Sequence, residues 1–293
     1  MSSVRFSRLQ PTRQAELALV AVTLLAASGW WFSHEALREM PPFVFLGSRF
    51  LLAGLLLAGL EPRALRALPR PDWLRALGVG LWFAAGMLVW ILALKHSPQL
   101  GVGAFLNSTS VVLVPLLGWL LWRQRIGLSG WACAGLAGLG VLALTGGQVQ
   151  WHGQGRYLLA ACLFAVYFNL NSRAVQHLGA LPLTAVVLTL TGIAGLLMAG
   201  LTGEPWRWPG LWTLLMLAAS VLLATCLRFW LQTYAQQQLS ASQAALLLTL
   251  EPVWTAALGL TLLGEHLSRL QLGGCGLIFL ALVLSRLWPV PRT

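Results

Sequence analysis

Long apolar stretches separated by short polar segments run through most of the sequence. Charged residues, prolines and glycines mark their ends, and each stretch is close to the roughly 20 residues that an α-helix needs to cross a bilayer. The pattern predicts spans near 17–35, 43–60, 75–94, 100–121, 127–145, 156–175, 181–201, 211–236, 240–263 and 269–287. We therefore expect an all-α polytopic membrane protein with ten transmembrane helices.

The composition excludes most soluble classes. Apolar side chains make up 58% of the 293 residues and charged ones only 9%, whereas a soluble protein carries about 25% charged residues. A soluble enzyme, a disordered chain and a disulfide-stapled secreted domain are therefore excluded. The four cysteines lie inside apolar stretches and have no metal-ligand spacing, and the histidines are scattered near span ends. We expect no metal site and no cofactor.

Positive charge dominates the polar segments, with a formal net charge of +11. The arginines stand in small groups between apolar stretches, so anionic lipid headgroups are their expected partners, and nucleic acid is not. Most basic residues fall on one side of the membrane if both termini are cytoplasmic, which is the orientation that we expect. Arg5, Arg8 and Arg13 precede the first apolar stretch, which we interpret as an uncleaved helix of a bacterial inner-membrane protein.

The two halves of the chain match at a nearly constant offset. Shifted by 141 residues, Ala104, Leu106 and Gly118 fall on Ala245, Leu247 and Gly259, and Gln124 falls on Glu265. Each repeat holds five spans, an odd number, so the two copies should cross the membrane in opposite senses. Inverted repeats are typical of secondary transporters, whose substrate site lies near the midplane between the copies. We expect repeats over residues 1–148 and 149–293.

Several motifs resemble the EamA-type repeat of the drug/metabolite transporter superfamily. They are Tyr234–Ala241, Leu250–Val253 and Leu263–Ser268 in the second half, and Gly29–Ser33, Pro41–Phe43, Gly47–Phe50 and Ala104–Leu117 in the first half. The resemblance implies a ten-helix inverted repeat that exports small metabolites such as amino acids, and it does not identify the substrate. One departure is Arg123–Arg125, which stands where the first repeat often has an acid.

Three charged residues lie at membrane depth, where charge is costly and therefore a functional candidate. They are Arg49, Arg228 and Glu251. By depth, Arg228 and Glu251 could meet on adjacent antiparallel helices. The pair is either a structural ion pair or a site in which Glu251 exchanges a proton or meets a substrate ammonium while Arg228 tunes it. Pro252 should interrupt the helix beside Glu251. Glu265, at the outer end, is expected to be a solvated cap.

Polar and aromatic residues at helical spacing indicate the walls of a cavity. Tyr167 and Asn171 share a helix face, as do Asn107 and Ser110, although such residues can also tie helices together. Tryptophans away from span ends could stack on an amphipathic or aromatic metabolite, with a lipid-facing or packing role as the alternative. The expected substrate-binding residues are Trp30, Trp82, Asn107, Tyr167, Asn171, Arg228, Trp230, Glu251 and Trp254.

The leading hypothesis is a secondary active transporter that exports a small metabolite by alternating access. No nucleotide-binding loop is present, so direct ATP coupling is not expected, and protons are candidate coupling ions. The alternatives are a multidrug or organic-cation exporter, an intramembrane enzyme and a channel. Gly130, Ala134 and Gly138 follow a small-residue spacing suited to close helix contact, within a monomer or in a homodimer.

Overall fold

The computed structural model describes residues 11–96, 99–122, 127–146, 151–239, 244 and 247–287. These ranges are mostly helical, and no strand occurs within them. The first half contains α1 (Pro11–Ala36), α2 (Pro42–Leu60), α3 (Pro62–Arg66), α4 (Arg70–His96), α5 (Leu100–Ser108), α6 (Ser110–Trp122) and α7 (Leu128–Thr145). The second half contains η1 (Trp151–Gly155), α8 (Arg156–Leu178), α9 (Ala180–Leu201), α10 (Leu211–Val221), η2 (Leu222–Leu227), α11 (Arg228–Gln238), η3 (Leu248–Leu250), α13 (Glu251–Leu262) and α14 (Arg269–Leu287).

Helices fill each of the ten predicted stretches, as far as these are described. Seven described segments are long and apolar enough to cross a membrane, and α7 and α14 contain shorter apolar stretches, Trp131–Ala143 and Arg269–Ala281. An all-helical chain with several membrane-spanning helices is therefore confirmed, whereas the number ten stays a prediction. Arg123–Arg125, Ala245 and Ser240–Ala241 of the predicted motifs lie outside the described residues.

The expected interruption at Pro252 takes a different form from the prediction. We expected this proline to interrupt a continuous span. Instead, α13 begins at Glu251, after the short 3-10 turn η3, and Pro252 occupies the first turn of the new helix. There the missing N–H has little cost, because the first N–H groups of a helix have no partner within it. Pro115 does lie inside α6.

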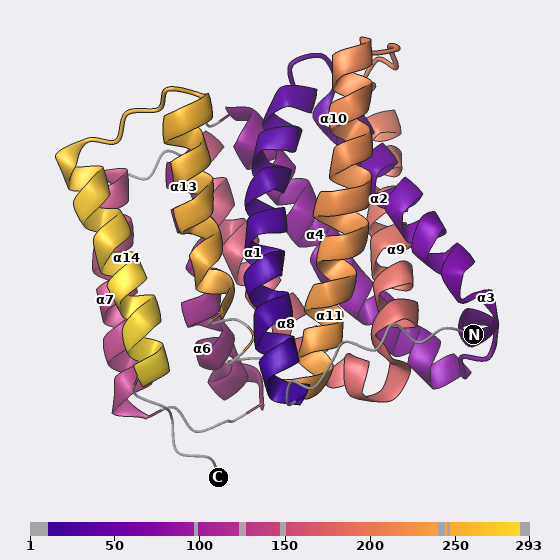
Figure 1. The fold of residues 1–293 in the computed structure, drawn as a ribbon, viewed down its shortest axis with the longest axis horizontal. Helices are drawn as coiled ribbons and strands as arrows, with labels where there is room; N and C mark the ends of the chain where they lie inside the picture. The colour runs from indigo at the N-terminus through magenta and orange to yellow at the C-terminus, as the bar shows by residue number, and fades with distance from the viewer. Residues whose placement is uncertain are drawn as a thin grey trace.

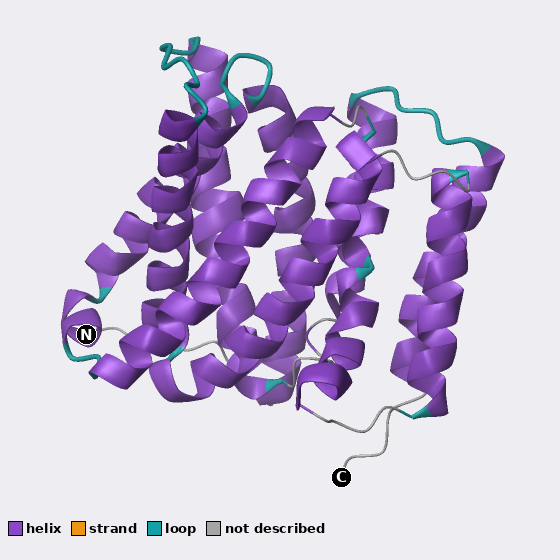
Figure 2. Ribbon diagram, turned by 180° about the vertical axis from the view of Figure 1, so that it is seen from behind, coloured by secondary structure: helices purple, strands orange, loops and turns teal. Residues whose placement is uncertain are grey.

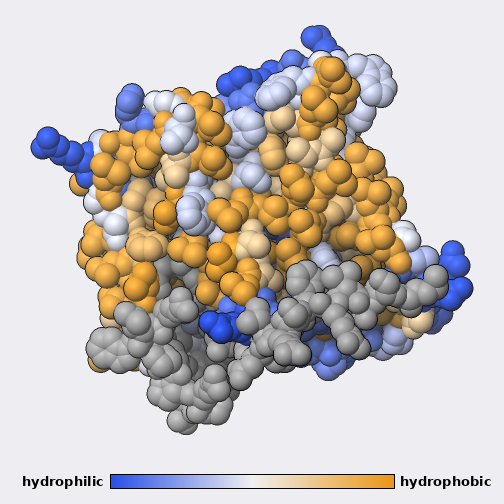
Figure 3. Space-filling view, viewed as in Figure 1, coloured by the Kyte–Doolittle hydropathy of each residue, from blue (hydrophilic) through white to orange (hydrophobic). Residues whose placement is uncertain are grey.

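The helices pack as an upright bundle, and segments from the two halves alternate within it (Figure 1). The main contacts join α2 with α9, α4 with α8, α1 with α11 and α13, α5 with α13, and α6 with α8. Helices α7 and α14 contact each other along one edge of the bundle in both views (Figure 2), and they also contact α5 and α6. In the face of Figure 3, an apolar band crosses the middle, and hydrophilic residues gather toward the margins, as expected for a protein in a bilayer.

Glycines bring α2 and α9 into backbone contact. A β-carbon on Gly195 would lie 2.7 Å from the Cα of Gly47, and one on Gly192 would collide with the backbone of Leu51. Small residues on both sides of a helix crossing are the usual means of close packing in membranes, where burial of apolar surface favours no particular helix pair. This contact joins the two halves of the chain.

Three carboxylates cap helices from neighbouring segments. Glu204 accepts hydrogen bonds from the backbone N–H groups of Phe43 (2.9 Å) and Val44 (3.0 Å) at the start of α2. Glu39 accepts one from Gly210 before α10, at 2.7 Å. Glu265 accepts from the N–H groups that open α5, at 2.5 and 3.1 Å. Glu265 is therefore not the solvated cap that we expected: it caps another helix, a contact that sequence position alone does not reveal.

We expect Gly192→Ala to destabilise the α2–α9 contact. The added methyl group would collide with the backbone of Leu51, which cannot move without shifting the whole helix. Overpacking of this kind typically costs about 1–3 kcal/mol. Gly200→Ala in the same helix is the matched control, because its β-carbon would meet open space. Thermal unfolding of both purified variants measures the difference, and equal midpoints would contradict the close contact.

Candidate functional site

A cavity lies between α1, α2, α4, α5, α6, α8, α11 and α13. Together with its open part, it holds about 860 Å³ of empty space. Its wall combines aromatic side chains with a few polar and charged groups, the usual composition of a small-molecule site.

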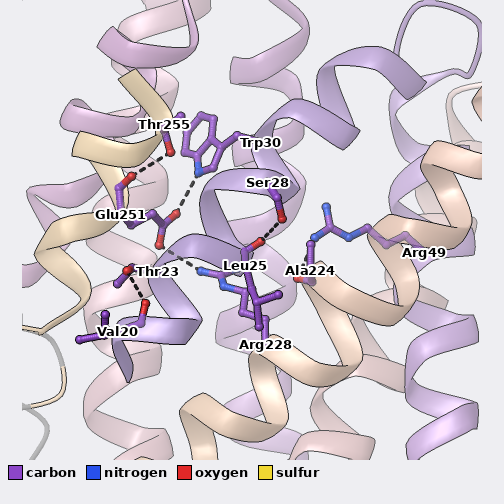
Figure 4. A network of polar contacts seen from close by, with 10 residues as sticks. All are labelled: Val20, Thr23, Leu25, Ser28, Trp30, Arg49, Ala224, Arg228, Glu251 and Thr255. Atoms are coloured by element: carbon purple, nitrogen blue, oxygen red, sulfur yellow. Dashed lines mark hydrogen bonds and ion pairs between the residues drawn. The ribbon is translucent and has the colours of Figure 1, made fainter. Parts of the chain in front are cut away.

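Glu251 is the centre of the charged part of the cavity. Its Oε1 accepts a hydrogen bond from Trp30 Nε1 at 2.9 Å, and its Oε2 lies 3.3 Å from Nη2 of Arg228 (Figure 4). The carboxylate also stands at the N-terminal end of α13, where the helix dipole favours negative charge. The carboxylate thus has three sources of stabilisation in an apolar interior, and Trp30 and Arg228 contribute two of them.

The Arg228–Glu251 contact occurs as the depth of the two residues predicted. However, α11 and α13 are not the adjacent pair that we expected. Both pack against α1, and the two side chains meet beside it. The guanidinium of Arg228 also lies over the Phe229 ring, 4.5 Å from its centroid. The pair therefore joins two helices that lie near each other in the sequence but pack mainly on α1.

Arg49 is a second guanidinium in the cavity wall, and it is only 3% exposed. It donates to Thr225 Oγ1 (2.6 Å), Ser33 Oγ (2.9 Å) and the carbonyl of Ala224 (3.1 Å). These partners are neutral, and no carboxylate in the described part of the chain lies within ion-pair distance of Arg49. The cavity therefore contains two guanidinium groups and one carboxylate, a net positive charge.

The π-helical turn η2 presents two of the Arg49 partners. Its wider turn carries the Ala224 carbonyl and Thr225 Oγ1, and the latter also donates to the Ser220 carbonyl five residues earlier, at 2.8 Å. Such turns are rare and are frequent at functional sites. Local irregularity in α10–η2–α11 thus gives the buried arginine polar contacts that a regular helix would not offer.

Other polar atoms of the wall have no hydrogen-bond partner among the described residues. They are Asn107 Oδ1, Arg228 Nε and Gln232 Oε1, all buried. Buried polar groups are nearly always satisfied, so a ligand or water is expected to bind them. Because these atoms line the same cavity as the Arg228–Glu251 pair, the cavity can also bind polar groups of a substrate.

Aromatic rings cover the rest of the wall. Trp30 packs edge-on against Trp90, with centroids 5.0 Å apart, and lies 5.7 Å from the Tyr157 ring. Elsewhere in the wall, the ring centroid of Phe83 lies 4.6 Å from that of Tyr167 and 5.0 Å from that of Phe229. These rings give an apolar body of a substrate a surface to stack on.

Five of the nine predicted residues line the cavity: Trp30, Asn107, Tyr167, Arg228 and Glu251. Four do not. Trp82, Trp230 and Trp254 are 42%, 37% and 38% exposed on the outside of the bundle, where lipid would contact them. Asn171 is buried and donates to Gln236 Oε1, so it ties α8 to α11.

Phe83 and Met87 also line the cavity and were not predicted to do so. Phe83, Met87 and Trp90 are spaced four and three residues apart on α4 and face the cavity together. The prediction used the neighbouring face of Trp82, one residue away. The i, i+4, i+7 spacing was a signal that could have found them. Across the described residues, no group of three His, Cys, Asp or Glu side chains could hold a metal ion.

The chain resembles known transporters over nearly its whole length. The EamA-like transporter family matches residues 13–146 and again residues 156–287. A protein of Archaeoglobus fulgidus named "Uncharacterized transporter" is 25% identical over 277 residues, which is 93% of this chain and 86% of that protein. The "Uncharacterized transporter YcbK" of Bacillus subtilis is 28% identical over 127 residues, 42% of this chain and 41% of that protein.

A solved crystal structure supports the fold. It aligns with a TM-score of 0.71 at 20% identity and covers 94% of this chain and 97% of that one. At this identity the likeness concerns the fold alone. The two family matches together span most of the sequence. The chain is therefore a member of the EamA-like transporter family.

Proposed function

We propose that this membrane transporter is a secondary carrier built from two inverted five-helix repeats, residues 1–148 and 149–293. Two separate matches to the family support the repeat. The helix contacts are also reciprocal: α1 packs on α11 as α8 packs on α4, and α1 packs on α13 as α8 packs on α6. Helices in equivalent positions, such as α2 and α9 or α7 and α14, contact each other. A pseudo-twofold axis in the membrane plane relates contacts in this way.

The substrate that fits the cavity best is a small amphipathic metabolite with a carboxylate, such as an amino acid with an apolar or aromatic side chain. Glu251 can accept an ammonium group, Arg49 or Arg228 can bind a carboxylate, and the aromatic wall can contact the apolar part. The observation that carries this proposal is the Arg228–Glu251 pair inside the cavity. An organic cation fits less well, because the two arginines outnumber the one carboxylate.

The charged pair suggests how substrate binding could drive alternating access. A substrate ammonium or a proton on Glu251 would compete with Arg228 for the same carboxylate. Because α11 and α13 both pack on α1, release of the pair would loosen helices from both sides of it. The Trp30, Trp90 and Tyr157 rings would then separate as the cavity changes the side from which it is accessible. We propose export across the bacterial inner membrane with both termini cytoplasmic, as the resemblance to exporters implies.

Reconstitution into liposomes tests this function. We expect saturable counterflow of a labelled amphipathic amino acid, measured with and without a pH gradient, and weaker competition by organic cations. A channel would not saturate in the same range, and an enzyme would release a modified product. Stronger competition by cations than by amino acids would favour the multidrug alternative.

We expect Glu251→Gln to reduce counterflow by about tenfold or more while the protein stays folded. Glutamine keeps the size of the side chain but loses its charge, and a hydrogen bond to a charged group contributes about 1.5–3 kcal/mol. Glu16→Gln is the control, because Glu16 is exposed near the start of α1. Counterflow is measured across pH, and an unchanged rate and pH profile for Glu251→Gln would remove the proposed role of this residue.

We expect Trp30→Phe to lower counterflow by about tenfold, because the lost indole N–H contributes a charge-assisted hydrogen bond to Glu251. Trp230→Phe and Trp254→Phe are matched controls, since both rings are on the outside of the bundle. These two variants should keep the counterflow rate of the wild type. If counterflow falls as much in these two variants as in Trp30→Phe, the substrate does not bind in this cavity.

A further inference from the structure

A second hollow lies on the outer side of the contact between α4 and α8. Residues Arg75, Gly78 and Trp82 of α4 line one wall, and Arg173 and His177 of α8 line the other. With its open part, the groove holds about 700 Å³ of empty space. It is separate from the central cavity, whose lining residues on these helices are Phe83, Met87, Trp90, Phe164, Tyr167 and Phe168.

The groove is basic at one end and apolar at the other. Helix α4 begins at Arg70 and α8 ends at Leu178, so Arg75, Arg173 and His177 all lie near the same edge of the bundle. Trp82 stands seven residues after Arg75 on α4, about 10 Å deeper at 1.5 Å per residue, and it is 42% exposed. A phospholipid has the same polarity, with a charged headgroup above an apolar chain.

Gly78, which has no side chain, gives the groove its depth. A β-carbon built on Gly78 would meet no heavy atom within 4 Å, whereas one on Gly80 would lie 2.8 Å from the Leu190 side chain. Glycine at position 78 therefore does not serve close helix packing, as Gly80 does. It leaves space between the two helices on the side that faces lipid.

The charges in the groove favour an anionic ligand. Arg75 Nη1 contacts Oδ1 of Asp72 at 2.7 Å, which balances one guanidinium. Arg173 adds a positive charge and is exposed, and the His177 ring lies beside it in the lining as a hydrogen-bonding group. Arginine binds phosphate through paired N–H donors, and basic pockets between transmembrane helices bind anionic lipid headgroups.

We propose that this groove binds one anionic phospholipid from the leaflet at that edge, with its phosphate at Arg75 and Arg173 and its acyl chain along Gly78 and Trp82. This inference does not depend on the substrate of the central cavity. A lipid in the groove would contact both α4 and α8 and should stabilise their packing. These helices belong to the two different family matches, so the lipid would join the two halves of the chain.

Lipid retention tests the proposal directly. The full chain is placed in nanodiscs that contain phosphatidylcholine with phosphatidylglycerol, and retained lipid is counted by native mass spectrometry after gentle extraction. We expect one retained phosphatidylglycerol and a higher thermal midpoint than in phosphatidylcholine alone. The Arg75→Gln/Arg173→Gln variant should bind this lipid at least tenfold more weakly, since each basic group near a membrane surface contributes about a fivefold effect.

Two matched controls separate the groove from general surface charge. Arg63→Gln/Arg66→Gln removes two exposed arginines of α3 and should retain the lipid. Gly78→Leu fills the groove without a change of charge and should also lose the lipid, whereas Gly59→Leu, which likewise enters open space, should not. Gly78→Leu keeps the test decisive if the double arginine variant does not fold.

Three results would overturn the proposal. The first is equal retention of phosphatidylcholine and phosphatidylglycerol. The second is retention of phosphatidylglycerol by a folded Gly78→Leu variant. The third is displacement of the lipid by inorganic phosphate. That result would indicate a site for a small anion, without a groove that binds the acyl chain.

Discussion

An ionised carboxylate in the apolar interior of a membrane protein needs partners, and Glu251 finds them on other helices. Trp30 of α1 and Arg228 of α11 contact its two oxygens. Glu251 also lies in the first turn of α13, where the positive end of the helix dipole stabilises a negative charge. The cost of an unpaired buried charge is several kcal/mol, which is a large fraction of the net stability of a protein. Three helices therefore meet around one side chain, and the cavity forms where they meet.

The remaining contacts keep those helices at the required distance. Gly47 and Gly195 let the backbones of α2 and α9 touch, and this contact joins the two halves on one side of the cavity. On the far side, Glu265 holds the start of α5 from the loop after α13. In lipid, burial of apolar surface does not select which helices pair. Close packing at glycines and capping by carboxylates select the helix partners instead. Bulky rings such as Trp30, Phe83 and Trp90 line much of the central cavity.

Much of the fold was predictable from the order of apolar and polar residues. The expected spans coincide with helices wherever the structure describes them, and the approach of Arg228 to Glu251 followed from depth alone. The aromatic wall was predicted only in part. In a soluble protein an exposed face is polar, but here both the lipid-facing and the buried faces are apolar, so the pattern does not reveal which way a tryptophan points. Trp82 and Phe83 are neighbours on α4, and only the second faces the cavity.

The sequence by itself therefore determined the class of protein, the position of its helices along the chain and the few charges that must be buried, because each follows from the cost of polar groups in hydrocarbon. Only the tertiary structure decided which helices pair, where α13 begins, which carboxylates cap neighbouring helices and which aromatic rings line the cavity. Those features depend on contacts between residues far apart in the chain, and no local pattern encodes the distance between them.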